Sequence, residues 1–274
     1  MVLDDYQKQR ILDACKQIRN RNIVENEWKF GGKTPYGRGL SILLYGAPGV
    51  GKTMSVQIIS QILGLDAYRI DLSQMVSKYV GETEKNLGEI FDMAKNSCSI
   101  LFFDEADALF SKRTDVKDSK DKYANMETAY LLQKMEEHDG IVILASNNIN
   151  NFDEAFQRRM QYIINIPLPG PAQRLKLWQS VFPPEAPIDE DVNFQFLAEK
   201  FELSGSRIKS ISIHAAYYAA EDRSSISPVH ILRALQVDMA KTGRLMSANE
   251  LGPYESLFGK LWQGGNKREK SEKN

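Results

Sequence analysis

The amino-acid sequence predicts an α/β protein with a three-layer αβα core, followed by a small all-helical domain. Apolar runs of strand length alternate with helical patterns up to Pro167, as in a parallel sheet with helices on both faces. Only helical patterns follow Pro171. A glycine-rich turn joins the first strand of this alternation to the next helix, which is typical of a phosphate-binding loop. We therefore expect a five-stranded parallel sheet with a ligand site at one edge.

Composition limits the classes of function. The chain has 274 residues, of which 42% are hydrophobic and 26% charged, values near the globular norm. Its 36 acidic and 35 basic residues give a net charge of -1, so we expect no nucleic acid partner. Cys15 and Cys98 predict neither a disulfide framework nor a zinc site and favour a reducing compartment. Because no apolar run exceeds strand length, we expect a cytoplasmic protein with no signal peptide and no membrane span.

The expected elements divide the chain into four parts: an N-terminal helix and linker (1–38), a large αβα domain (39–169), a small helical domain (170–262) and a disordered polar tail (263–274). Strands are expected at 40–45, 66–71, 99–103, 141–145 and 162–166. Helices are expected at 4–19, after the glycine-rich turn, around 87–94 and at 123–137, with a loop at 20–39. The small domain is expected to hold helices at 172–181, 192–200, 206–220 and 228–241, the last one started by the cap Ser227 and by Pro228.

The glycine-rich turn has the residues that phosphate binding needs. Glycines let the backbone wrap closely around phosphate, and the following helix, whose inward face is Val56, Ile59 and Leu63, presents its positive end to the negative charge. The Lys52 ammonium is expected on the β- and γ-phosphates, and the Thr53 hydroxyl on Mg²⁺. The expected nucleotide-binding residues here are Gly46, Ala47, Pro48, Gly49, Val50, Gly51, Lys52, Thr53 and Met54.

Two adjacent carboxylates end the third strand. Asp104 follows the apolar run 99–103 and is expected beside the Mg²⁺ held by Thr53. We therefore count it both as a metal-binding and as a cofactor-binding residue. Glu105 is expected to orient and deprotonate the attacking water. The alternative is that both acids only cap a helix, but a phosphate-binding loop requires an acid on a nearby strand, which favours the catalytic interpretation.

Polar residues in two further places fit phosphoryl transfer. Asn147, at the end of the fourth strand, can place its side-chain amide near the γ-phosphate. Asn148 is its neighbour, and the alternative is that either asparagine only stabilises a turn. Arg158 and Arg159 precede the fifth strand and can neutralise the charge that develops on the γ-phosphate. An Arg-Arg pair taken alone is more often a solvated surface pair.

In this order and spacing, the motifs resemble the AAA family of ATPases in the AAA+ superfamily. The corresponding elements are Walker A (Gly46 to Thr53), Walker B (Asp104 and Glu105), sensor 1 (Asn147) and the arginine-finger segment (Arg158 and Arg159), and the match extends from about Gly39 to Met246. The resemblance implies a P-loop NTPase core with a helical lid, ATP and Mg²⁺ as ligands, and ATP hydrolysis that drives the unfolding or remodelling of a protein substrate. It also implies a homo-oligomeric ring, usually a hexamer, in which the arginines act on the neighbouring subunit's nucleotide.

The resemblance places a pore loop after the second strand, where Lys78, Tyr79, Val80 and Gly81 form an aromatic-aliphatic-glycine element that would grip a polypeptide. The alternative is that Tyr79 is a core residue, but its polar neighbours favour exposure. The charged segment 111–122 is expected to be either a second pore loop or subunit contact, or a plain solvated run.

In the lid, Gly205, Ser206 and Arg207 resemble a Gly-x-Arg sensor-2 motif, although AAA lids proper carry Ser-Gly-Ala-Asp there. Arg207 is therefore expected either to touch the γ-phosphate or to lie on the lid surface. Segments 69–73, 118–125 and 241–245 further resemble the ATPases of phage-tail-like contractile injection systems. Two other classes stay open, a nucleotide-dependent assembly switch and a nucleic-acid-handling loader.

Replacing Tyr79 by alanine tests the pore-loop interpretation. We expect the variant to keep nearly all basal ATP hydrolysis and to lose the unfolding of a destabilised reporter protein, because the aromatic ring grips polypeptide rather than nucleotide. Both rates are measured on the same preparation, and circular dichroism reports folding. Loss of hydrolysis together with loss of folding would show that Tyr79 belongs to the core.

Overall fold

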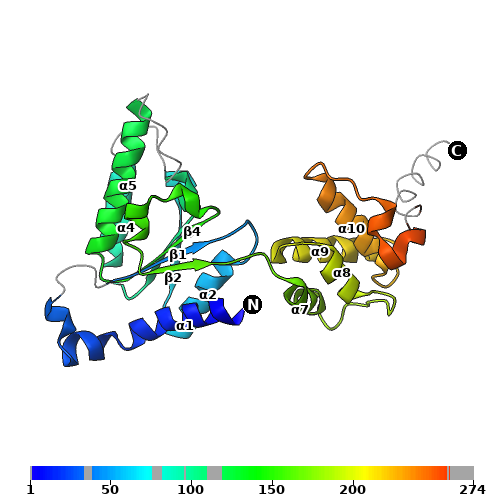
Figure 1. Cartoon of the computed structure of the whole chain (residues 1–274), viewed down its shortest axis with the longest axis horizontal. Coiled ribbons are helices and arrows are strands. Elements are labelled where there is room, and N and C mark those ends of the chain that lie inside the picture. Colours follow the sequence, from blue (N-terminus) through cyan, green and yellow to red (C-terminus); the bar gives the residue numbers. More distant parts are fainter. Residues whose placement is uncertain are drawn as a thin grey trace. The chain divides into compact units, whose positions relative to one another are not determined.

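The computed structural model describes residues 2–33, 39–75, 82–95, 97–109, 119–257 and 259. The chain divides into two compact units, residues 3–167 and the residues from Leu168 on. Figure 1 shows the first unit as a sheet with helices on both faces and the second as helices only. No helix in the described ranges is long and apolar enough to cross a membrane.

The first unit is built on five parallel strands in the order β2-β3-β4-β1-β5. The strands are β1 (Leu40–Tyr45), β2 (Ala67–Asp71), β3 (Ile100–Asp104), β4 (Ile141–Ser146) and β5 (Tyr162–Asn165). The helices are α1 (Asp5–Arg19), α2 (Lys52–Leu63), α3 (Leu72–Met75), α4 (Glu82–Ala94), α5 (Ser119–Glu137) and α6 (Glu154–Gln157). The expected parallel sheet and αβα class are thereby confirmed.

Alternation along the strands creates two cores, one on each face of the sheet. Ile42 and Leu44 of β1 pack with α1 and α2, whereas Leu43 between them packs with α4 and α5. Successive side chains of a strand point to opposite faces, so a central strand that is buried on both sides is apolar throughout. In Figure 1, α1 and α2 accordingly lie on one side of the sheet and α4 and α5 on the other.

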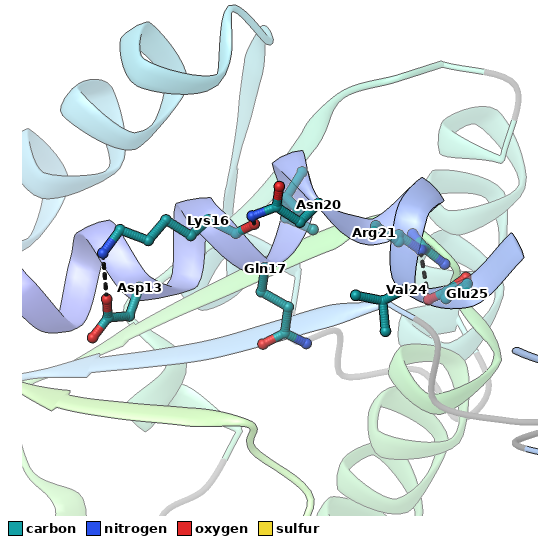
Figure 2. Close-up of a pocket in the computed structure, with 8 residues that line it drawn as sticks. Asp13, Lys16, Gln17, Asn20, Arg21, Val24 and Glu25 are labelled. Atoms are coloured by element: carbon teal, nitrogen blue, oxygen red, sulfur yellow. Dashed lines mark hydrogen bonds and ion pairs between the residues drawn. The ribbon is translucent and has the colours of Figure 1, made fainter. Parts of the chain in front are cut away.

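The expected loop at 20–39 is wrong in part, because the chain forms a π-helical turn at Ile23–Glu27 and a 3-10 turn at Phe30–Lys33. Arg21 supports the first turn through an ion pair of 2.9 Å with Glu25, four residues on, and it also donates to the Asp139 carbonyl. Figure 2 shows this pair at the end of α1.

Several element ends differ from expectation for local reasons. The helix expected at 192 begins instead at Phe194, because the Asn193 side chain accepts the Phe196 N–H at 2.9 Å and caps it. Strand β3 includes Asp104, which is in register with Asp71 of β2. Helix α5 begins at Ser119, inside the segment expected to be a charged loop.

The second unit is helical, as expected. Its helices are α7 (Pro171–Val181), α8 (Phe194–Lys200), α9 (Gly205–Glu221) and α10 (Pro228–Ala240), followed by 3-10 turns at Ala248–Glu250 and Gly252–Leu257. Trp178 of α7 is fully buried in its core and stacks on Phe194. Helix α10 starts at Pro228 behind the cap Ser227, as the sequence predicts.

Candidate active site

Three sequence motifs meet at one edge of the sheet. The glycine-rich loop follows β1, Asp104 ends β3, and Asn147 follows β4, which lies between β1 and β3. In a parallel sheet the carboxyl ends of all strands share one edge, and ligands bind in the crevice outside that edge. The expected phosphate-binding, metal-side and sensing residues therefore share the edge where a nucleotide would lie.

The glycine-rich loop adopts a backbone that requires glycine. Gly46 has φ of 152°, and a Cβ on it would lie 2.1 Å from the Ile166 carbonyl oxygen, closer than any contact a side chain tolerates. Gly51, at the start of α2, has φ of 110°, which side chains other than glycine rarely adopt. The loop backbone therefore packs directly against the residue that follows β5.

Lys52 is the central cation of this edge. Its ammonium donates to the carbonyls of Gly46 at 2.7 Å and Ala47 at 3.2 Å, and to Oδ1 of Asn147 at 2.9 Å. Burial lowers the pKa of Lys52, while the charges of Asp107 and Asp104 act in the opposite direction. The adjacent Thr53 and Met54 side chains are exposed at the first turn of α2.

The two carboxylates after β3 differ in environment. Asp104 is buried, and its Oδ1 accepts the Glu105 N–H at 3.0 Å while its Oδ2 pairs with Arg69 of β2 at 2.8 Å. Glu105 is exposed and has φ of 54°, a left-handed conformation that is costly for a residue other than glycine. Strain at such a position is often found at functional sites, and here it turns the chain sharply away from the buried Asp104.

Asp107 is a site residue to which sequence reasoning gave no role. Its Oδ1 accepts a hydrogen bond from the Ser146 hydroxyl, and its Oδ2 accepts one from the Asn147 N–H at 2.9 Å. The 3-10 turn Ala106–Ala108 places Asp107 next to the end of β4, so this residue positions the backbone that carries the Asn147 amide. The run Asp104-Glu105-Ala106-Asp107 contains the clue, a third acid one short turn after the strand.

The structure separates the two asparagines. The Asn147 amide oxygen faces Lys52, whereas the Asn148 Oδ1 accepts the Asn150 N–H at 2.9 Å and caps the turn Ile149–Asn151. Asn148 therefore performs the turn chemistry that was the alternative for either residue. Only Asn147 lies against the residues of the glycine-rich loop.

Arg158 and Arg159 lie at the opposite edge of the sheet. They precede β5, and the Arg159 carbonyl accepts the Ser41 hydroxyl at 3.1 Å, next to the amino end of β1. A strand rises by about 3.3 Å per residue, so β1 separates this end from the glycine-rich loop by about 16 Å. The side chains are surface-exposed and paired, Arg158 with Glu154 at 2.5 Å and Arg159 with Glu136 at 3.0 Å. The two arginines therefore lie far from the chain's own glycine-rich loop.

The remaining expected site residues lie in the second unit or outside the described residues. Gly205, Ser206 and Arg207 begin α9 in the second unit, where the Arg207 guanidinium pairs with the buried Asp238 of α10 at 2.6 Å. Lys78, Tyr79, Val80 and Gly81, together with residues 111–118, lie outside the described residues. The hollow of Figure 2, lined by residues such as Lys16 and Arg21, lies near the amino end of β4, because Arg21 donates to the Asp139 carbonyl.

The donor set fits a magnesium–nucleotide complex. Thr53 and Asp104 offer oxygen ligands, and the described residues contain no group of three or more His, Cys, Asp or Glu side chains that could hold a metal ion. Magnesium at nucleotide sites usually takes one or two protein ligands and completes its shell with phosphates and water. Fold and site together define a P-loop nucleotide-binding protein.

Comparison with known proteins defines the family. Residues 42–168 match the ATPase family associated with various cellular activities (AAA). Similar proteins are the proteasome-activating nucleotidases of Saccharolobus solfataricus, 30% identical over 218 residues, and Archaeoglobus fulgidus, 32% identical over 210 residues. That of Methanosarcina mazei is 31% identical over 219 residues. The alignments cover 76%, 73% and 76% of this chain and 55%, 52% and 52% of those relatives.

The chain thus carries an AAA ATPase domain, and it spans about half the length of the curated relatives it matches. The resemblance to the AAA family is confirmed. The narrower resemblance to ATPases of contractile injection systems stays a prediction.

Replacing Asp107 by asparagine tests its role in positioning Asn147. We expect ATP hydrolysis to slow by about tenfold or more, because two hydrogen bonds to a charged acceptor are weakened, each worth about 1.5–3 kcal/mol. Nucleotide affinity should change by less than about threefold, since Lys52 and the loop stay in place. The control is Asp92→Asn, at an exposed acid of α4 that pairs with Lys95, three residues on. Unchanged hydrolysis in Asp107→Asn would contradict the positioning role.

Proposed function

We propose that this chain hydrolyses ATP as a subunit of a homo-oligomeric AAA ring, with a hexamer as the expected form, and that hydrolysis unfolds or remodels a protein substrate. The observation that supports this most strongly is the distribution of the site over two edges of one sheet. Lys52, Asp104 and Asn147 lie at the carboxyl edge, while Arg158 and Arg159 lie at the amino edge. A site divided in this way is complete only when two copies of the chain meet.

Each residue has a role in this proposal that follows from its chemistry. The glycine-rich loop, Lys52 and the positive end of α2 bind the phosphates of ATP. Thr53 and Asp104 would hold Mg²⁺, which neutralises phosphate charge when it is bound. Glu105 orients and deprotonates the attacking water, and its exposed position leaves it accessible to that water. Asn147 contacts the γ-phosphate or the water from beside Lys52.

Neutralisation of charge is the role of the arginines. As the γ-phosphate is transferred, negative charge spreads over its oxygens, and a guanidinium from the neighbouring subunit stabilises that charge. Arg159 is 44% exposed and Arg158 is 73% exposed, so both can leave their glutamate partners for a phosphate. Surface ion pairs of this kind contribute little to stability, typically about 0–1 kcal/mol. We therefore expect the exchange of partners to cost little.

The protein substrate is proposed from the relatives. Their name states that they activate proteasomes, and a pore loop at Lys78 to Gly81 would be the part of this chain that contacts polypeptide. A cytoplasmic location belongs to the same proposal. The role of Gly205, Ser206 and Arg207 as nucleotide contacts is also proposed, and for Arg207 it requires release from Asp238.

A connection to a contractile injection apparatus is a narrower proposal. It is supported by the segments 69–73, 118–125 and 241–245, of which residue 118 lies outside the described residues. Identification of the proteins that co-purify with the chain from its native cells tests it. Sheath or tail components among the co-purified proteins would support the connection. Co-purification of other substrates without any such component would contradict it.

The ring mechanism is tested by the dependence of ATP hydrolysis on protein concentration, with mass determination in parallel. We expect specific activity to rise cooperatively as the chain assembles, because each site needs a neighbour's arginines. The double variant Arg158→Ala/Arg159→Ala should bind nucleotide and assemble, but it should hydrolyse ATP at least about 1,000-fold more slowly, the range known for arginine fingers.

The matched control is Glu136→Gln/Glu154→Gln, which removes the carboxylate charge of both ion pairs and keeps the arginines. It should retain most of the activity. Hydrolysis by a monomer that does not depend on concentration would contradict the ring and favour a solitary nucleotide switch. Binding of DNA with a steep salt dependence would favour the nucleic-acid-handling alternative.

A further inference from the structure

Arg69 places a positive charge beside Asp104, the acid that is expected to bind Mg²⁺. It lies on β2, an edge strand of the sheet, next to β3. Its Nη2 is 2.8 Å from Oδ2 of Asp104, and the other carboxylate oxygen, Oδ1, accepts the Glu105 N–H at 3.0 Å. Both oxygens of the acid expected to face Mg²⁺ are therefore engaged within the chain itself.

The two partners differ in exposure. The Asp104 side chain is 12% exposed, whereas the Arg69 side chain is 58% exposed. A largely buried carboxylate benefits from a nearby cation, because desolvation of the charged form is otherwise unfavourable. The exposed guanidinium, on a long and flexible stem, can move into solvent when another cation takes its place.

Two cations near one carboxylate repel each other. The interaction between charges a few ångströms apart falls with the effective dielectric, which is about 20 near a protein surface, and solvent screens it further at a half-exposed group. A divalent ion that reaches Asp104 must therefore displace the guanidinium or bind against its charge. In either case Arg69 weakens the binding of the metal.

We propose that Arg69 competes with Mg²⁺ for Asp104, so that the arginine neutralises the acid when the metal is absent and is displaced when a metal–nucleotide complex binds. This inference rests on the proposed nucleotide function and extends it. The expected consequence is a lower affinity for Mg²⁺, which favours its departure from the site. Arg69 would thus regulate the affinity of the site for Mg²⁺.

The test compares nucleotide affinity with and without metal. The dissociation constant of a fluorescent ADP analogue is measured in Mg²⁺ and in EDTA, and the ratio of the EDTA value to the Mg²⁺ value reports how strongly the metal contributes. Removing a positive charge weakens binding of the bare nucleotide and strengthens binding of the metal complex. For Arg69→Gln we therefore expect this ratio to increase about tenfold over that of the wild type.

Matched variants isolate the charge. Arg69→Lys keeps a cation and should stay within about threefold of the wild-type ratio. Arg19→Gln removes an exposed arginine that donates to the Ile62 carbonyl, at the far end of α2, and should not change the ratio. Arg69→Met, which retains the stem of the side chain, replaces Arg69→Gln should the latter fail to fold.

The outcomes distinguish this inference from the proposed function. An unchanged ratio in folded Arg69→Gln would overturn the competition, since the ion pair would then be only structural. A reduced ratio would also overturn it, because Arg69 would then be holding Asp104 in place for the metal. A wild-type chain that binds no nucleotide, with or without Mg²⁺, would overturn the proposed function itself.

Discussion

The position of the Lys52 ammonium is the constraint on which the rest of the site depends. It is held by two carbonyls of the glycine-rich loop and by the Asn147 amide, so one charge connects the ends of β1 and β4. Asp107 completes the connection, because it binds the backbone of Asn147 from the turn after β3. Three strand ends are thereby held at one edge, which is the preorganisation that phosphoryl transfer needs.

Charge pairing is a second theme, since arginines of functional interest hold carboxylates in this structure. Arg69 holds Asp104, Arg159 holds Glu136 and Arg207 holds Asp238. The pair of Arg159 is half-exposed on both sides, so exchange of its carboxylate for a phosphate costs little. Asp104, the partner of Arg69, is buried, so another cation must take over its charge when Arg69 leaves. The pair of Arg207 likewise involves a buried acid, Asp238, whose other carboxylate oxygen lies 3.8 Å from the Lys241 ammonium.

The class of fold could be predicted because it follows from local sequence patterns and does not require the order of the strands in the sheet. Buried strands such as 40–45 and 141–145 are apolar on both faces, and the residues of the glycine-rich turn by themselves indicate phosphate binding. Arg69 could not be assigned in this way, because its partner depends on β2 lying beside β3, which no local pattern indicates. Asp107 was missed for the same reason. The π-helical turn at Ile23–Glu27 depends on Arg21, which pairs with Glu25 within the turn but also contacts Asp139, far along the chain.

Glu105 is the residue proposed to activate water for hydrolysis of a nucleotide held by Lys52 and Asp104. The most direct measurement compares bound ATP and ATP turnover in the wild type and in Glu105→Gln, with Glu89→Gln, at an exposed acid of α4, as control. We expect Glu105→Gln to retain ATP and to turn it over at least about 100-fold more slowly, the usual range for loss of a general base, while the control is unchanged. Hydrolysis at the wild-type rate in Glu105→Gln would contradict it.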